Sequence, residues 1–389
     1  MAHAARKTRK DGTVVYYAVY RDPDGNERSA GSHPTKRQAE RVADDKEREI
    51  ESGAYVDPAK GKITFAKYVE DNYWPSVEPL ELSTLAGYRS NIRTHFIPAF
   101  GKIPMVKITP SMIQAWVNSV SPGSAMPGAR VLAPRSIKKY HVVLSSIFDY
   151  AVIERIIPFN PCTYTKFPTI IMPDKHIVTP EEFDTIAKVL GPRWIVMVET
   201  DLEVGPRWGE LIALRPCDVD WPTRMVDIRR VILELRKADS VKGPFNPIHE
   251  IPSGERFVVK EYTKGVLPRK VQISPELCTM LREHMLALGI RDEDLFFTAP
   301  NGGYLSRSTF RQKVWQPAVK RAGIKRNVTF HNLRAASASW TLAGGEDVKT
   351  VMAKYGWRQL ATAQGYLGTL PDAGESAITA FNRTRSRAR

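Results

Sequence analysis

Two short stretches in the second half of the chain carry side chains suited to chemistry on a phosphate diester. GPRWGE places Arg207 at an expected helix start, with Glu210 one turn later to hold it. FHNLR places His331 and Arg334 three residues apart, so that imidazole and guanidinium lie on one helix face and can approach the same anion. Two arginines can clamp a phosphodiester and stabilise a pentavalent transition state.

Two further stretches add a proton donor and a nucleophile. Lys264 lies at the predicted turn of a hairpin between strands at 256–263 and 269–273, from which it could reach a site and donate a proton. YGW ends at Trp357 and is followed nine residues later by Tyr366, whose hydroxyl could attack phosphorus covalently. Each stretch alone also fits an ordinary surface or core residue. Together they supply the groups for a phosphoryl transfer that needs no divalent ion.

These stretches, in this order and over about 200 residues, resemble the catalytic domain of the tyrosine recombinases, also called the phage integrase family. GPRWGE resembles the first arginine box of that family, HNLR its His-x-x-Arg box, and YGW with Tyr366 its Leu-Gly-His box and nucleophile. Trp357 stands where histidine is commonest in the family, although tryptophan occurs there in some members. A tryptophan keeps a ring N–H donor but cannot transfer a proton.

The resemblance implies these catalytic residues: Arg207, Lys264, His331, Arg334, Trp357 and Tyr366. The tyrosine would attack the scissile phosphate, leaving a 3′-phosphotyrosyl link and a free 5′-hydroxyl, with no cofactor. The arginines and the tryptophan would bind the non-bridging oxygens, the histidine would aid proton transfer at the tyrosine, and the lysine would protonate the leaving oxygen. Lys260 is the rival for the lysine, because the stretch from Lys264 to Val271 is longer than the usual turn of the family.

The composition favours a polyanionic partner. The 389 residues include 57 lysines and arginines against 42 acidic residues, a formal charge of +15, and such an excess attracts nucleic acid. Between Glu81 and Asp149 no acidic residue occurs. A helix predicted at 135–155 in this region carries basic residues opposite its buried stripe, and we expect them to face phosphate rather than only solvent: Arg135, Lys138 and Lys139.

The segment at residues 62–168 is predicted to be helical and is similar to the core-binding domain of the family. Its expected helices lie at 64–74, from Ser83 to a point before Pro98, at 111–119 and at 135–155.

Residues 1–57 predict a small module, with strands at 13–21 and 27–31 and a helix at 36–52 that begins after a Thr35 cap. A basic arm precedes the strands: Arg6, Lys7, Arg9 and Lys10. The module is too small for much of a core. It resembles the arm-binding domain of lambda-type integrases, and a stabilising cap on the catalytic body is the alternative.

The proline-punctuated stretch at residues 160–175 predicts an interdomain linker. After it, a capping-box pattern at Thr179 starts a helix within the catalytic domain, residues 175–389. The expected fold class is α+β and mainly α-helical, with a small N-terminal sheet, a helical middle domain and a mixed α/β catalytic domain.

Several other classes of protein are disfavoured. The cysteines form no CxxC pair, which fits a reducing cytosol, and no apolar run approaches a membrane span. A metal-dependent transposase would need clustered carboxylates, and the tight candidates, at 218–220 and 292–294, look like loop and cap residues. A non-catalytic DNA-binding protein remains the alternative from a different class.

The predicted function is that of a site-specific recombinase, an integrase that inserts phage or mobile-element DNA into a host chromosome. The resemblance implies double-stranded DNA attachment sites as substrate and a homotetramer on two duplexes. It also implies a host DNA-bending protein and an excisionase as partners. No membrane partner is expected, because no apolar run is long enough for a span, and the expected location is the cytoplasm of a bacterial host, at the nucleoid.

Overall fold

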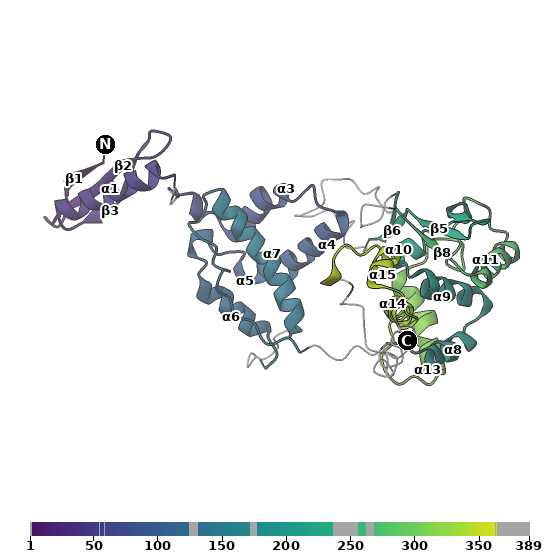
Figure 1. Ribbon diagram of the computed structural model, residues 1–389. Helices are drawn as coiled ribbons and strands as arrows, with labels where there is room; N and C mark the ends of the chain where they lie inside the picture. The colour runs from purple at the N-terminus through teal and green to yellow at the C-terminus, as the bar shows by residue number, and fades with distance from the viewer. Residues whose placement is uncertain are drawn as a thin grey trace, which may run out of the picture. The chain divides into compact units, whose positions relative to one another are not determined.

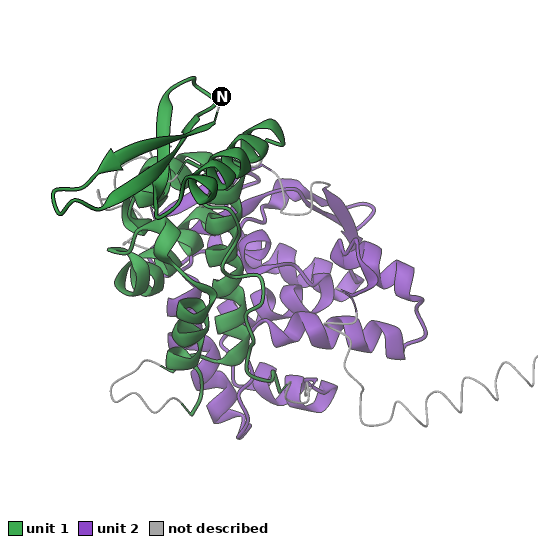
Figure 2. Cartoon of the chain, turned by 90° about the vertical axis from the view of Figure 1, so that its left-hand side faces the viewer, with its two compact units in different colours: residues 1–172, 241–250 green, residues 173–240, 251–389 purple. Residues whose placement is uncertain are grey.

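The computed structural model divides the chain into two compact units, residues 1–172 with 241–250 and residues 173–240 with 251–389 (Figure 2). The structure describes residues 2–53, 55–57, 59–123, 131–171, 177–235, 256–261 and 268–361, together with Ala363. The division between the units falls after Met172, inside the stretch predicted as a linker.

The first unit begins with a three-stranded antiparallel sheet and one helix (Figure 1). Its elements are β1 (His3–Thr8), β2 (Val14–Arg21), β3 (Glu27–His33) and α1 (Lys36–Glu51). The Thr35 side chain accepts a hydrogen bond from the Gln38 N–H, as an N-cap does. Alanines from β2 and α1 bring the helix close to the sheet: Ala18, Ala39 and Ala43.

The prediction of a basic arm before the sheet is wrong for residues 3–8, which form β1. Arg6 and Lys7 lie in this strand and pair with Tyr16 and Val15 of β2, while Arg9 follows in the turn. The strand lacks β-branched residues before Thr8, so its propensity for β structure is weak. Backbone pairing with the neighbouring strand β2 decides its conformation.

The rest of this unit is helical. Its helices are α2 (Phe65–Tyr68), α3 (Trp74–Ser76), α4 (Leu82–Asn91), α5 (Ile97–Phe100), α6 (Pro110–Val120) and α7 (Pro134–Ile153). Turns of π-helix at Val69–Tyr73 and Ile92–Phe96 join α2 to α3 and α4 to α5. Aromatic and branched side chains form the core, among them Phe65, Phe96, Ile137, Leu144 and Phe148.

The predicted helix end before Pro98 is wrong, because the helical path continues to Phe100. In the π-turn the Ile97 N–H donates to the Ile92 carbonyl, five residues back. Pro98 then lies in the first turn of α5, where the missing N–H of a proline costs little.

The described part of the second unit contains eight α-helices and five strands. The helices are α8 (Pro180–Lys188), α9 (Pro192–Val204), α10 (Trp208–Leu211), α11 (Pro275–Leu288), α12 (Arg307–Phe310), α13 (Gln316–Arg321), α14 (Asn332–Ala343) and α15 (Val348–Tyr355). The strands are β4 (Val219–Asp220), β5 (Met225–Ile228), β6 (Val231–Glu234), β7 (Phe257–Lys260) and β8 (Arg269–Gln272). At the start of α8, Thr179 and Glu182 form the predicted capping box.

The hairpin predicted on either side of Lys264 does not form from the described strands. β7 pairs with β6, and β8 pairs with β5 in a separate sheet. Lys260 lies opposite Val231 and Arg269 lies opposite Ile228, so β7 and β8 pair with successive parts of one stretch of chain. Strand pairing of this kind depends on long-range contacts, which the local alternation of residues does not specify.

Candidate active site

Arg207 is held in place by Glu210, one turn further along the chain. Its backbone N–H donates to Glu210 Oε2 at 2.9 Å, and its Nη1 donates to Oε1 at 2.8 Å. The side chain of Glu210 is 1% exposed and that of Arg207 is 36% exposed. The carboxylate is therefore buried below a guanidinium that still reaches solvent, which is the arrangement needed to present an arginine to a ligand.

Arg334 is the most buried arginine of the site. It lies in α14 at 1% exposure, its Nη1 donates to the Gly205 carbonyl, and its Nη2 donates to the Tyr355 carbonyl at 2.7 Å. These two acceptors end different helices, α9 and α15. The guanidinium of the HNLR stretch therefore joins the GPRWGE stretch to the YGW stretch.

Two aromatic rings lie next to the guanidinium of Arg334. The Tyr355 and Trp357 rings stack with centroids 4.9 Å apart, and the Arg334 guanidinium carbon lies 5.0 Å and 5.6 Å from them. The Tyr355 hydroxyl donates to Ser337 Oγ at 2.5 Å. Trp357 is 5% exposed, so most of its ring contacts protein and contributes to a rigid platform beneath the guanidinium.

His331 lies at the N-terminal end of α14 and remains exposed at its surface. Partial loss of hydration, followed by the positive charges of Arg334, Arg307 and Arg207, lowers the pKa of His331 to about 4. The ring is therefore neutral at pH 7, with a nitrogen that can accept a proton.

The pKa of Glu210 is set by neighbouring charges that outweigh the effect of burial. Burial alone would raise its pKa, but the hydrogen bonds and charges of Arg269 and Arg207 outweigh burial and lower the pKa to about 2. The carboxylate is thus ionised throughout the neutral range and keeps both arginines paired.

Three functional candidates were missed by the sequence analysis. Arg269 in β8 contacts Glu210, and Arg307 at the start of α12 adds positive charge near His331. Asp201 is fully buried in α9, where burial raises its pKa well above the ordinary value against the charges of Arg334 and Arg307. The sequence could have pointed to Asp201, because a carboxylate among the apolar residues of a helix is unusual. An arginine in a strand is common and gives no such indication.

Two residues of the predicted site, Lys264 and Tyr366, lie outside the described residues. The rival lysine, Lys260, is the last residue of β7, partly buried and opposite Val231. Arg207, His331, Arg334 and Trp357 all belong to the second unit, where Arg334 joins their elements.

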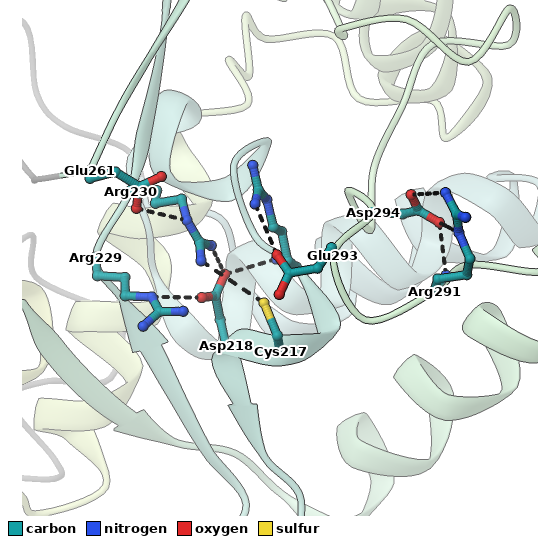
Figure 3. A network of polar contacts seen from close by, with 9 residues as sticks. Cys217, Asp218, Arg229, Arg230, Glu261, Arg291, Glu293 and Asp294 are labelled. Atoms are coloured by element: carbon teal, nitrogen blue, oxygen red, sulfur yellow. Dashed lines mark hydrogen bonds and ion pairs between the residues drawn. The ribbon is translucent and has the colours of Figure 1, made fainter.

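The acidic clusters considered for a metal are engaged by arginines (Figure 3). Asp218 Oδ1 accepts from Arg229 Nε at 3.0 Å, and its Oδ2 accepts from Arg230 Nη1 at 2.6 Å. Likewise Glu293 pairs with Arg215, and Asp294 with Arg291. In the described part of the chain, no three His, Cys, Asp or Glu side chains are placed to hold a metal ion.

The basic residues predicted to bind DNA lie on the surface of the first unit. Arg135, Lys138 and Lys139 are exposed at the start of α7, opposite its buried stripe. In the sheet, Arg6 lies opposite Tyr16 on the α1 side, whereas Lys7 lies on the open face with its Nζ 5.8 Å from the Tyr17 ring centroid. None of the helices described in the two units is long and apolar enough to cross a membrane.

Comparison with known proteins matches residues 178–371 to the phage integrase family and residues 64–121 to the phage integrase N-terminal SAM-like domain. The chain belongs to the phage integrase family. The match at 178–371 contains Arg207, His331, Arg334 and Trp357. The basic residues at the start of α7 lie outside both matched stretches of this integrase.

The integrases of two mycobacterial phages match most of this integrase. It is 25% identical over 365 residues to the integrase of Mycobacterium phage D29, which covers 90% of this chain and 88% of the relative. It is 24% identical over 362 residues to the integrase of Mycobacterium phage L5, covering 90% and 89%. A XerC-like tyrosine recombinase of Caldanaerobacter subterraneus is 26% identical over 270 residues, 64% of this chain and 66% of the relative.

Solved structures share the fold of the integrase at low sequence identity. A lambda integrase dimer bound to a COC′ core site superposes with a TM-score of 0.57 and 19% identity over 93% of each chain. The Tn1549 transposon integrase in complex with circular intermediate DNA gives 0.64 and 14%, covering 82% of this chain and 99% of that chain. The integrase is an enzyme, a site-specific DNA recombinase that integrates phage or mobile-element DNA.

Proposed function

We propose that the integrase cuts and rejoins DNA through a covalent 3′-phosphotyrosyl intermediate at Tyr366. The tyrosine oxygen forms a bond to phosphorus while the bond from phosphorus to the 5′ oxygen breaks. A second 5′-hydroxyl then reverses the step on the exchanged strand. The energy of the phosphodiester is kept in the protein–DNA link, so the reaction needs no cofactor.

The observation that carries this proposal is the convergence of the arginine boxes. Arg334 donates to the carbonyls of Gly205 and Tyr355, while Glu210 holds Arg207 two residues beyond Gly205. Two guanidinium groups supported in this way can bind the non-bridging oxygens of one phosphate, with Trp357 as a further donor. They would neutralise the negative charge carried by the non-bridging oxygens in the transition state.

Protons move between side chains in this scheme. His331, neutral at pH 7 because its pKa lies near 4, accepts the proton of the attacking tyrosine. Lys264 protonates the departing 5′ oxygen, with Lys260 as the rival for this role. One proton is taken and one is given in each step, so the step balances without water.

The proposed reaction exchanges strands between two DNA duplexes, so it needs several copies of the integrase. We infer a homotetramer on two duplexes that carry attachment sites, with a host DNA-bending protein and an excisionase as partners in the cytoplasm of a bacterial host, at the nucleoid. A lambda integrase tetramer bound to a Holliday junction shares the fold, with a TM-score of 0.57 at 18% identity. Exposed Arg135, Lys138 and Lys139 on α7 would face the backbone of the core site.

The test uses a nicked duplex that carries the attachment site. The sequence of this site is taken from the ends of the mobile element that encodes the integrase. Tyr366→Phe keeps the ring and removes only the nucleophilic oxygen, so it should lower the yield of covalent adduct by at least about 1,000-fold while DNA binding stays within about threefold. Adduct is measured on denaturing gels in the presence of EDTA.

The matched control is Tyr164→Phe, because Tyr164 is 88% exposed in the first unit. That variant should form adduct at the wild-type rate. An undiminished adduct yield in Tyr366→Phe would remove the nucleophile from the proposal. Binding without adduct or cleavage in the wild-type protein would favour a non-catalytic DNA-binding protein. Cleavage without adduct that is lost in EDTA and rescued by magnesium would favour a metal-dependent transposase.

A further inference from the structure

Arg269 lies between elements of the site that are far apart in the sequence. It belongs to β8, its side chain is 9% exposed, and its Nη2 contacts Glu210 Oε2 at 2.6 Å. Its Nε donates to the Lys354 carbonyl at 3.1 Å. One guanidinium therefore joins a strand, the helix start that carries Arg207, and the end of α15.

The contact with Glu210 determines how that carboxylate is oriented. Glu210 Oε2 accepts from both Arg269 and the backbone N–H of Arg207, and Oε1 is then directed at Arg207 Nη1, 2.8 Å away. A carboxylate held at one oxygen by a buried arginine cannot rotate without breaking an ion pair. Arg269 thereby fixes the position of the exposed guanidinium of Arg207.

The contact with α15 acts on the other half of the site. The last turn of this helix exposes carbonyls that have no partner within the helix. Arg269 binds that of Lys354, and Arg334 binds the next one, that of Tyr355, at 2.7 Å. The helix ends at Gly356, where a Cβ atom would lie 3.4 Å from Arg269 Cδ, so the arginine packs against the glycine of the YGW stretch.

We propose that Arg269 is a positioning residue for DNA cleavage. It links Glu210, which holds the phosphate-binding guanidinium of Arg207, to the end of α15, and so fixes the position of Arg207 relative to Arg334. The proposal rests on the proposed function, because it assumes that Arg207 and Arg334 bind the scissile phosphate. Arg269 itself is buried and does not need to touch DNA. Its effect should appear in the rate of cleavage rather than in the affinity for DNA.

The experiment compares Arg269→Gln with the wild-type integrase in single-turnover adduct formation on the nicked attachment-site duplex. A misplacement of about 1 Å in such a site costs about 100-fold in rate, so a loss of that size is expected with a dissociation constant within about threefold of wild type. Arg291→Gln is the matched control, since that arginine is 86% exposed and pairs with Asp294 away from the arginine boxes. It should cleave at the wild-type rate.

A second substrate separates positioning from general support of the fold. In a methylphosphonate at the scissile position, a methyl group replaces one non-bridging oxygen and the negative charge is lost. A neutral phosphorus centre needs the arginine clamp less, so the deficit of Arg269→Gln should shrink at least about tenfold on this substrate. An equal deficit on both substrates, or cleavage as fast as in Arg291→Gln, would overturn the proposal.

Arg269→Lys covers the case in which the glutamine variant fails to fold. Lysine keeps the charge but lacks the planar fork that reaches Glu210 and Lys354 together. It should show the same pattern of loss on the phosphodiester and recovery on the methylphosphonate, and a full wild-type rate in a folded lysine variant would contradict the bridging role. If the wild-type protein forms no adduct in this assay, the proposed function itself fails. The proposal for Arg269 fails instead when the wild-type protein forms adduct but the variants do not differ from it as described.

Discussion

His331 shows how the surroundings of one residue set its chemistry. A solvated histidine titrates near pH 6.5 and would be partly charged at neutral pH. Here partial loss of hydration and the charges of Arg334, Arg307 and Arg207 favour the neutral ring. The arginines that would bind the phosphate thus also keep the neighbouring imidazole able to accept a proton.

We expect the proton resonances of His331 in the DNA-free protein to titrate with a midpoint near pH 4. Its folded pKa lies below the unfolded value of 6.5, so the unfolded chain takes up this proton first as the pH falls. The stability that the neutral ring contributes is present above pH 6.5 and is lost between pH 6.5 and about 4. The resonance is assigned by its absence in His331→Gln and followed by NMR, and a midpoint at or above 6.5 would contradict this account.

At the scale of elements, the ends of two helices determine the shape of the site. α9 ends at Gly205 and α15 at Gly356, with φ values of 62° and 63° in the left-handed region. Gly205 also packs directly on an aromatic ring, because a Cβ atom there would lie 2.1 Å from Tyr355 Cε1. Only glycine allows α9 to turn here while its carbonyl accepts from Arg334.

Gly205→Ala should therefore lower the free energy of unfolding by at least about 3 kcal/mol, the sum of left-handed backbone strain and a clash with Tyr355. Gly289→Ala is the matched control, since Gly289 ends α11 at φ 63° with no atom within 4 Å of the added Cβ. That variant should lose only about 1 kcal/mol. Urea unfolding measures both changes, and equal losses in the two variants would show that the ring contact contributes nothing.

For the whole molecule, the charges of the N-terminal module suggest how it meets DNA. The helix α1 carries most of its acidic residues and covers one face of the sheet, while Lys7 and Tyr17 lie on the open face. An open sheet face with a basic strand can enter a DNA groove. We therefore propose that the module binds an arm-type DNA site separate from the site of cleavage.

Deletion of residues 1–55 should leave binding and cleavage at the core site unchanged. It should remove protection of separate arm sites in a footprinting assay and block integration between two attachment sites. Lys7→Gln is a milder variant, expected to weaken protection at the arm sites without unfolding the sheet. Full integration by the truncated protein, or an isolated module without sequence preference on attachment-site DNA, would favour the alternative of a stabilising cap.

The amino-acid sequence by itself determined the features that depend on neighbouring residues. The Thr35 cap, the Thr179 capping box and the pairing of Arg207 with Glu210 all join groups three residues apart, so local spacing is enough to specify them. The order of the arginine, histidine and tryptophan stretches was likewise readable, because each is short and contiguous.

Tertiary structure alone decided the contacts between segments distant in sequence. Arg269 meets Glu210 across 59 residues, and Arg334 meets Gly205 across 129. β7 pairs with β6, and residues 3–8 form β1 by pairing with β2. Both pairings depend on which strand lies alongside, and the alternation of residues along one strand does not specify its neighbour. Short-range patterns thus pointed to the candidate residues Arg207, His331, Arg334 and Trp357, whereas long-range burial and hydrogen bonding decide which residues hold them in position.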